Sequence, residues 1–176
     1  MSVDATLTEV DALSHNLLLM GSPLQNSWSN RLSPSFPVRF GPLPADSSAG
    51  LPAVPAGSFA IGLCVFSTPG IGLIFTFPMP SSADIPLSSV HAVQRGGAIG
   101  LGVFGTDEEG LRDAVSLAQP TIPPMVRAPF TNQVPDFIVT GPSYRWKGIG
   151  GVLCAGFWGN DWRYAPDSSF SVDKCH

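Results

Sequence analysis

The apolar residues near the start of the chain recur at helical spacing. Between residues 4 and 20 they fall three or four positions apart, which collects them on one face of a helix. Thr6 followed by Glu9 has the pattern of a capping box, and Gly21 with Pro23 supplies a stop signal. The pattern therefore predicts a first helix that ends near Gly21. Its apolar face would comprise Leu7, Val10, Leu13, Leu17 and Met20.

A long uncharged tract follows in the middle of the chain. Residues 47–83 contain no Asp, Glu, Lys or Arg, and the apolar run over residues 59–77 has the length of a membrane span. Thr68–Ile71, however, carries Pro and Gly where a type II turn needs them, and no Trp, Tyr or basic residue borders the run. We therefore predict a buried hairpin with strands Phe59–Ser67 and Ile71–Phe77. A membrane segment is the alternative.

Shorter apolar runs bounded by Gly or Pro predict the remaining elements. Strands are expected at Ala98–Phe104, Phe137–Thr140 and Gly151–Phe157. Helical periodicity over Asp107–Ala118 predicts a second short helix. Residues 119–135 form a proline-rich connection.

A second proline-rich segment covers residues 22–57. Its seven prolines remove amide donors and bias the preceding residues toward extended backbone, so no long helix fits there. Its three aromatic residues favour an arm that lies along another surface over a flexible linker. The chain is therefore divided into an N-terminal helix at 1–21, an extended arm or linker at 22–57 and a β-rich core domain at 58–176.

Composition narrows the fold class. Gly and Pro together supply 37 of the 176 residues, while 44% of the chain is hydrophobic. This mixture is typical of short strands joined by many turns, and a chain of this length favours one core over two. The predicted fold is mainly β, an antiparallel sandwich or barrel-like single domain with two short helices and long Pro-rich connections. An α+β layered domain is the alternative.

Charge and cysteine content exclude several function classes. Charged residues make up 12% of the chain, about half the usual share of roughly 25%. With a net charge of −4 and only two lysines, the chain lacks the basic stripe that nucleic-acid binding needs. Three widely spaced cysteines match neither a disulfide framework nor a zinc site, so reduced thiols and no metal are expected. The acidic N-terminus does not resemble a secretory signal, which favours an intracellular or virion location.

One stretch resembles a nucleotide-binding loop. Gly100–Gly105 matches the spacing G-x-G-x-x-G and precedes a predicted helix. Asp107, Glu108 and Glu109 would repel a phosphate at that helix terminus, and capping by Thr106 with Glu109 explains them better. No Gly-x-Ser-x-Gly elbow occurs either. We therefore predict no catalytic residues and no cofactor.

The stretch from Tyr144 to Tyr164 is the strongest candidate for a binding surface. It contains both tyrosines and three of the four tryptophans, interleaved with basic residues. Aromatic and Arg side chains are enriched at binding hot spots, although the same rings could instead fill the core. The predicted partner-binding residues are Tyr144, Arg145, Trp146, Lys147, Trp158, Asn160, Asp161, Trp162, Arg163 and Tyr164, together with Trp28 on the arm.

These features predict a structural or assembly protein. Such a chain buries surface against neighbouring subunits and so needs few solubilising charges. The expected role is a subunit or accessory surface protein of a viral capsid or similar large particle, acting through contacts with other protein subunits in a homo- or hetero-oligomer. The alternative is a ligand-binding module that uses the aromatic patch at 144–164. A small nucleotide-using enzyme and a membrane-associated protein are less favoured.

Overall fold

The computed structural model describes residues 7–8, 11–12, 15–80, 98–118 and 135–172. These residues form nine strands in two sheets and three α-helices, with 38% strand against 23% helix. The mainly β prediction is therefore confirmed. Neither sheet closes into a barrel, so the barrel-like form is wrong. Within the described residues, no helix is long and apolar enough to cross a membrane.

The larger sheet has six strands in the order β1-β6-β5-β7-β8-β9. β1 runs parallel to β6, so the sheet departs from the predicted antiparallel pattern at this edge, whereas the other neighbours are antiparallel. The strands are β1 (Leu17–Met20), β5 (Gly72–Pro78), β6 (Ile99–Gly105), β7 (Phe137–Thr140), β8 (Val152–Trp158) and β9 (Tyr164–Ser171).

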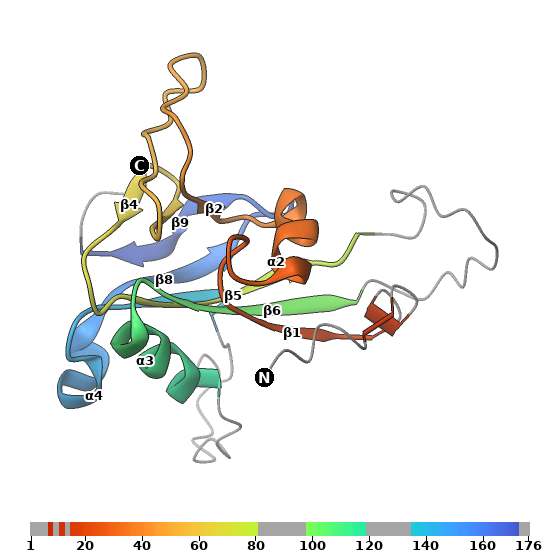
Figure 1. Ribbon diagram of the computed structural model, residues 1–176. Helices are drawn as coiled ribbons and strands as arrows, with labels where there is room; N and C mark the ends of the chain where they lie inside the picture. The colour runs from red at the N-terminus through yellow and green to blue at the C-terminus, as the bar shows by residue number, and fades with distance from the viewer. Residues whose placement is uncertain (1–6, 9–10, 13–14, 81–97, 119–134, 173–176) are drawn as a thin grey trace.

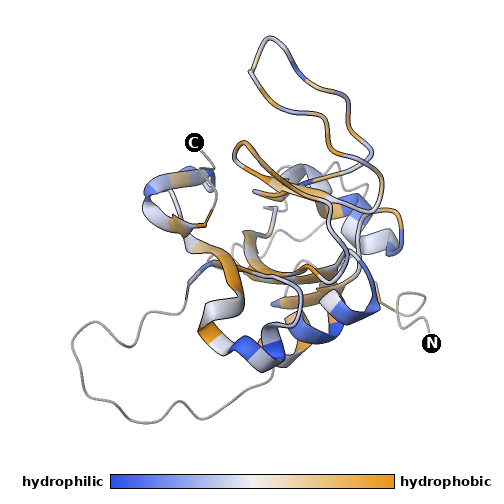
Figure 2. Ribbon diagram, turned by 90° about the vertical axis from the view of Figure 1, so that its left-hand side faces the viewer, coloured by the Kyte–Doolittle hydropathy of each residue, from blue (hydrophilic) through white to orange (hydrophobic). Residues whose placement is uncertain are grey.

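The second sheet and the helices lie on the two faces of the larger sheet. Figure 1 shows the larger sheet with the small sheet β2-β3-β4 and α2 on one side and α3 on the other. The remaining elements are β2 (Arg39–Phe40), β3 (Phe59–Ile61), β4 (Cys64–Phe66), α2 (Ser27–Leu32), α3 (Glu108–Ala118), α4 (Tyr144–Lys147) and the 3-10 turns η2 (Ser33–Ser35) and η3 (Gly148–Gly151). Figure 2 shows hydrophobic residues along the strands and a mostly hydrophilic α3.

Phenylalanine rings fill the space between the two sheets. Phe36 packs edge-on against Phe77 with ring centroids 4.6 Å apart, and Phe40 packs edge-on against Phe104 at 5.1 Å. Phe59 of the small sheet also contacts Phe104, at 5.7 Å. Alternate residues of a strand point to one face, so Phe75 and Phe77 of β5 lie on the same face. Phe75 and Phe104 contact the small sheet through Phe40, and Phe77 contacts Phe36. This aromatic layer is the centre of the core.

The glycines of the Gly-x-Gly motif lie within β6 and serve this packing. Phe75 pairs across the sheet with Gly102, and Phe77 pairs with Gly100. A Cβ at Gly102 would lie 2.3 Å from the ring of Phe75, and a Cβ at Gly100 would lie 2.0 Å from the ring of Phe77. Each ring therefore lies over a glycine of the neighbouring strand, a known way of stabilising glycine in a sheet. Packing accounts for these two glycines of the motif without a nucleotide.

Helix α3 is capped by Asp107, which corrects the predicted Thr106 and Glu109 cap. One carboxylate oxygen of Asp107 accepts a hydrogen bond from the backbone N–H of Gly110 at 2.9 Å, and the other accepts one from the N–H of Gly70 at 2.9 Å. The Thr106 hydroxyl instead donates to the carbonyl of Thr68. The carboxylate therefore fixes the start of α3 to the turn that precedes β5.

The predicted N-terminal helix is wrong over its last turn. Leu17–Met20 is strand β1, although residues 11 and 12 are helical. Four consecutive apolar residues fit a helix or a buried strand equally by pattern, and parallel pairing with β6 decides for the strand. Thr6 and Glu9, the proposed capping box, lie outside the described residues. Gly21 ends the strand with φ 96°, a value suited to glycine.

The predicted hairpin of residues 59–77 is also wrong. Its first half folds on itself at Gly62, so β3 pairs with β4 in the small sheet. Its second half, β5, pairs with β6 and β7 in the larger sheet. The Pro69-Gly70 turn is present, with φ 79° at Gly70, but it connects the two sheets. The Gly62 turn, with φ 55°, is the feature that the pattern of apolar residues concealed.

The proline-rich segment 22–57 folds onto the chain's own core. α2 places Trp28 and Leu32 against it, and β2 joins the small sheet. Between β2 and β3 the backbone projects as a finger, closed by bridges from Leu43 to Val54 and from Asp46 to Leu51. The expected second proline-rich connection, 119–135, lies outside the described residues except for its last position.

Candidate functional site

The structure divides the predicted aromatic patch into two groups. Tyr144, Arg145, Trp146 and Lys147 form helix α4, which precedes β8, and the other patch residues from 158 onward follow at the far end of that strand. The seven residues of β8 span roughly 23 Å at strand spacing. The two groups therefore do not form one surface. Trp28 lies on α2, apart from both.

The group at the far end of β8 mainly stabilises the fold. Trp158 is buried, stacks on Phe137 with ring centroids 4.3 Å apart, and donates its indole N–H to the carbonyl of Thr76 at 2.9 Å. Tyr164 also packs against Phe137, at 6.1 Å. Asp136 accepts the backbone N–H of Trp158 at 3.1 Å. These contacts account for both aromatic rings as core residues.

The turn between β8 and β9 carries the other residues of that group. Asn160, Asp161 and Arg163 are exposed, and Trp162 is half-buried with φ 59°. Asp161 accepts the backbone N–H of Arg163 at 3.2 Å, and their side chains form an ion pair at 3.6 Å. An exposed ion pair of this kind contributes little stability. Its main effect is to order the turn.

Trp28 is likewise a core residue. Its ring is buried under α2, and the guanidinium of Arg31 lies 5.3 Å from the ring centroid. Such a cation–π contact covers the outer side of the ring.

Helix α4 and the 3-10 turn η3 each present one large apolar side chain to solvent. Trp146 is 88% exposed and Ile149, in η3, is 90% exposed. The backbone turns sharply on both sides of the helix, with φ 65° at Ser143 and φ 54° at Gly148. A large exposed tryptophan is uncommon in a soluble domain, because burying it would be favourable. We call residues 144–151 the α4–η3 surface.

An ion pair between a buried carboxylate and a partly exposed guanidinium fixes α4 to α3. The Nε of Arg145 donates to Oδ1 of Asp113 at 2.8 Å. The side chain of Asp113 is only 2% exposed, whereas that of Arg145 is 42% exposed. The second carboxylate oxygen of Asp113 is buried and has no hydrogen-bond partner among the described residues. A buried carboxylate oxygen without a partner is costly, so it marks a place where a donor is wanted.

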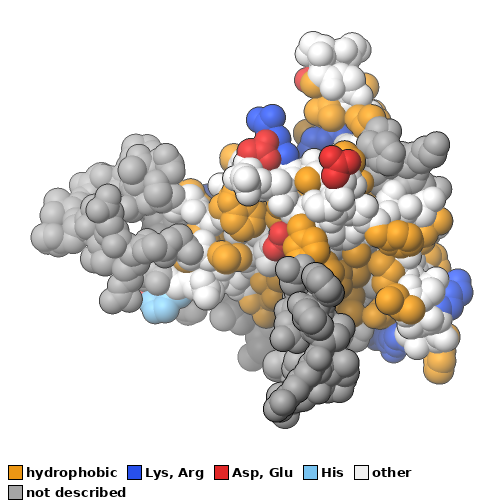
Figure 3. Space-filling view, turned by 180° about the vertical axis from the view of Figure 1, so that it is seen from behind, with side chains coloured by type: hydrophobic (Ala, Val, Ile, Leu, Met, Phe, Trp, Pro, Cys, Tyr) orange, Lys and Arg blue, Asp and Glu red, His pale blue; other side chains and the backbone are white. Residues whose placement is uncertain are grey.

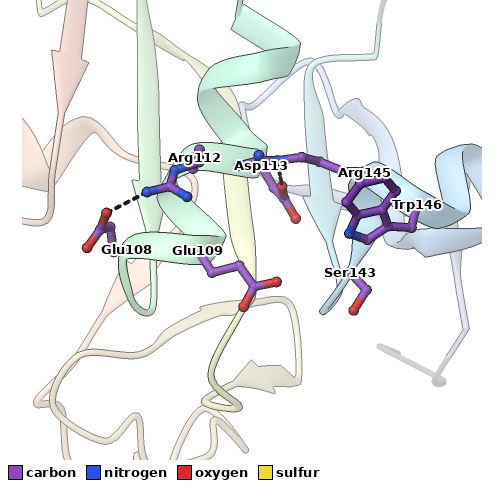
Figure 4. Close-up of a pocket in the computed structure, with 7 residues that line it drawn as sticks. All are labelled: Glu108, Glu109, Arg112, Asp113, Ser143, Arg145 and Trp146. Carbon is purple, nitrogen blue, oxygen red and sulfur yellow. Dashed lines mark hydrogen bonds and ion pairs between the residues drawn. The ribbon is translucent and has the colours of Figure 1, made fainter.

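A hollow of about 340 Å³ lies between α3 and α4 beside this ion pair. Figure 4 shows its lining, with the Glu109 carboxylate extending toward Ser143 and the free oxygen of Asp113 facing the space between them. We call it the α3–α4 hollow. Its lining residues are Glu108, Glu109, Arg112, Asp113, Ser143, Arg145 and Trp146.

The charges of the hollow do not balance. Glu108 is paired with Arg112 at 2.6 Å, and Asp113 is paired with Arg145. Glu109 has no hydrogen-bond or ion-pair partner among the described residues, so the lining carries one unneutralised negative charge. The hydroxyl of Ser143 also lacks a partner within this described part of the chain. The hollow thus suits a cation with several N–H donors.

Asp113, Glu109 and Ser143 were not predicted as site residues. Gly110, Asp113 and Ala114 form the buried side of α3, where an aspartate among small residues interrupts an otherwise apolar stripe. A charged residue on the buried face of a helix implies a partner elsewhere in the fold. The aspartate at position 113 was therefore the one signal in the sequence that could have indicated a site on α3. No group of three metal-ligating side chains occurs among the residues that the structure describes.

A scan against protein-family models, a search of curated proteins and a search of solved structures each give no match to this chain. The α4–η3 surface and the α3–α4 hollow are therefore the features from which we infer a function.

The cysteines differ from one another, which corrects the expectation of reduced thiols throughout. Cys64 is disulfide-bonded, and Cys154 is a free, buried thiol in β8. Cys175 lies outside the described residues. Burial raises the pKa of Cys154 from 9.0 to about 11.

We expect Cys154 to resist alkylation in the folded protein. At pH 8 a thiol of pKa about 11 is ionised in about one molecule per thousand, and the thiolate is the reactive form. Unfolding should release the thiol, and the free energy of unfolding should decline as the pH rises from 9 toward 11, because the unfolded thiol ionises first. Mass spectrometry after iodoacetamide treatment, with and without urea, measures the alkylation of Cys154. Rapid labelling of Cys154 in the native protein would contradict its burial.

Proposed function

We propose that this chain is a structural protein that self-associates, as a subunit or accessory protein of a larger particle, and that the α4–η3 surface forms its contact with another copy. The observation that carries this proposal is the exposure of Trp146 and Ile149 on a backbone fixed by the Arg145–Asp113 pair. Tryptophan is among the residues that most often dominate binding energy at interfaces. A pre-ordered contact also loses little entropy on binding.

Further exposed apolar side chains lie at the edge of the larger sheet, beside the start of β8, which follows η3. Phe170 and Val172, at the end of β9, are 59% and 62% exposed. Val172 is joined to β8 by a hydrogen bond from its N–H to the carbonyl of Leu153 at 2.9 Å. Figure 3 shows hydrophobic side chains gathered on this side of the molecule, with Lys and Arg at the margin. Exposed apolar side chains gathered on one side, with charged residues at the margin, are typical of a protein–protein interface.

The scaffold that we propose for this surface is a two-layer sandwich. The ring contacts of Phe36, Phe40 and Phe59 with the larger sheet support the small sheet as its second layer. Such a scaffold would leave α4 and the projecting finger free to contact neighbours.

The Trp146→Ala variant is expected to weaken self-association about 30-fold, because truncating a hot-spot tryptophan costs about 2 kcal/mol. Sedimentation velocity across a concentration series measures the dissociation constant. Thermal stability should change little, since the ring is exposed. Leu24→Ala is the matched control, because Leu24 is an exposed apolar residue on another part of the molecule. Equal association by the wild type and the Trp146→Ala variant would remove α4 as the contact.

A further inference from the structure

The α3–α4 hollow has the chemistry of a site for a primary ammonium group. An alkylammonium carries three N–H donors and one positive charge on an apolar stem. The hollow offers the carboxylate of Glu109, the hydroxyl of Ser143 and the buried oxygen of Asp113, none of which has a partner in the part of the chain that the structure describes. The indole of Trp146 forms its outer wall and can cover an aliphatic stem or a cation.

The single unneutralised charge sets the charge of the ligand. Two of the three carboxylates in the lining are already paired with arginines, at 2.6 and 2.8 Å. One further positive charge makes the hollow neutral, whereas an anion would face Glu109 without compensation. A guanidinium is a planar fork and suits two parallel acceptors, but the acceptors here lie on three separate residues. A compact ammonium with rotatable donors fits this arrangement better.

The same surface also carries the complementary group. Lys147 follows Trp146 on α4, is exposed, and places its ammonium 3.4 Å from the carbonyl of Pro142. It is the one lysine among the described residues. In a two-fold symmetric dimer the same patch faces itself, so a group on one copy meets a different group of the other copy, and the reverse contact follows by symmetry. A lysine beside an acidic hollow is the self-complementary pair that such an interface needs.

We infer that the α3–α4 hollow binds an alkylammonium group, and that in the assembly this group is Lys147 of a second copy. This inference rests on the proposed self-association for its source, but the ammonium site itself does not depend on it. Binding would place the ammonium between Glu109 and Ser143, above the buried Asp113 oxygen. Trp146 would then lie over the lysine stem and be covered by the second copy.

The site is tested first with a small probe on the whole chain. Nα-acetyl-lysine amide is titrated while the indole N–H resonance of Trp146 is followed by NMR, with that resonance assigned from the Trp146→Ala variant. We expect saturable shifts at millimolar concentration that weaken as salt rises. Nα-acetyl-norleucine amide, which lacks the ammonium, should give none. Absence of saturable shifts with the lysine probe would overturn the site.

Two charge variants locate the site. Glu109→Gln should weaken probe binding at least fivefold, because it removes the unpaired charge. Asp167→Asn is the matched control, since it removes one exposed carboxylate on β9 and should leave probe binding unchanged. Equal weakening by both variants would mean general attraction to an acidic protein and would overturn the site.

Whether the ammonium group comes from Lys147 of a second copy is tested by exchanging the charges of Lys147 and Glu109. Lys147→Glu and Glu109→Lys should each weaken self-association at least tenfold, and the double variant should recover most of it, because the two charges again attract. Sedimentation velocity provides the measurement. If the probe binds but association is unaffected by Lys147→Glu, the ammonium comes from another protein and the second-copy source is wrong. If the wild type is monomeric while the probe binds, the proposed function fails and the site stands.

Discussion

We expect the Phe75→Ala variant to lose about 4 kcal/mol in free energy of unfolding. The ring of Phe75 is 2% exposed and contacts the rings of Phe36, Phe40 and Phe77. It also lies over the backbone of Gly102. Its removal opens a cavity between the two sheets that rigid neighbouring strands can fill only in part. Urea denaturation followed by tryptophan fluorescence measures the loss, and a loss below about 1 kcal/mol would contradict the aromatic layer as the core.

A paired variant tests whether packing explains the glycines of β6. Gly102→Ala would place a Cβ 2.3 Å from the Phe75 ring, and overpacking of this kind costs about 1–3 kcal/mol. In a Phe75→Leu background the ring is absent, so the same alanine should cost less than about 1 kcal/mol. Equal costs in the two backgrounds would show that the ring of Phe75 is not what requires glycine at position 102.

If packing alone explains the glycines of β6, the thermal midpoint of the wild-type protein should not change when nucleotides are added.

The Arg145→Met variant is expected to lose about 2–4 kcal/mol in free energy of unfolding. Methionine leaves the carboxylate of Asp113, whose side chain is 2% exposed, without a counter-charge. Breaking one side of a buried pair costs about 3–5 kcal/mol, and the partial exposure of Arg145 places this case toward or below the lower end of that range. Guanidinium denaturation measures the loss. The variant should also weaken self-association, because α4 loses its fixed position.

Two further variants distinguish the loss of the pair from a general loss of positive charge. Arg112→Met removes a cation from the exposed pair with Glu108 and should cost less than about 1 kcal/mol. The double variant Asp113→Asn/Arg145→Met removes both charges of the pair, so no buried carboxylate is left without a counter-charge, and it should recover most of the stability. A double variant as unstable as Arg145→Met alone would mean that the arginine acts through packing of its stem.

The sequence predicts those elements whose limits are set by local residues. β6, β7, β8 and α3 lie within one residue of their predicted limits, because Gly, Pro and capping residues bound their apolar runs. β1 was mistaken for helix since its four apolar residues fit both structures, and only pairing with a strand some 80 residues away distinguishes them. The Gly62 turn was concealed inside a uniformly apolar tract.

The candidate site could be predicted only in part for the same reason. Trp146 and its neighbours are conspicuous in a chain with only four Trp, two Tyr and nine Lys and Arg residues, so composition finds α4. The hollow needs α3 and α4 to meet, and the Arg145–Asp113 contact joins residues 32 positions apart. Composition also grouped Trp158 with Trp146, although Trp146 lies on α4, before β8, and Trp158 is the last residue of β8. β8 runs from the exposed Trp146 side to the buried Trp158, so the two rings lie far apart. The composition of a segment does not reveal the direction of a strand.

The mass of the purified wild-type chain in solution, measured by light scattering over a wide concentration range without detergent, tests the proposed self-association most directly. We expect a mass that rises from 18.5 kDa for the single chain to that of a defined oligomer, and that stays lower for Trp146→Ala at the same concentrations. A wild-type chain that remains monomeric at the highest concentrations would contradict self-association through the α4–η3 surface.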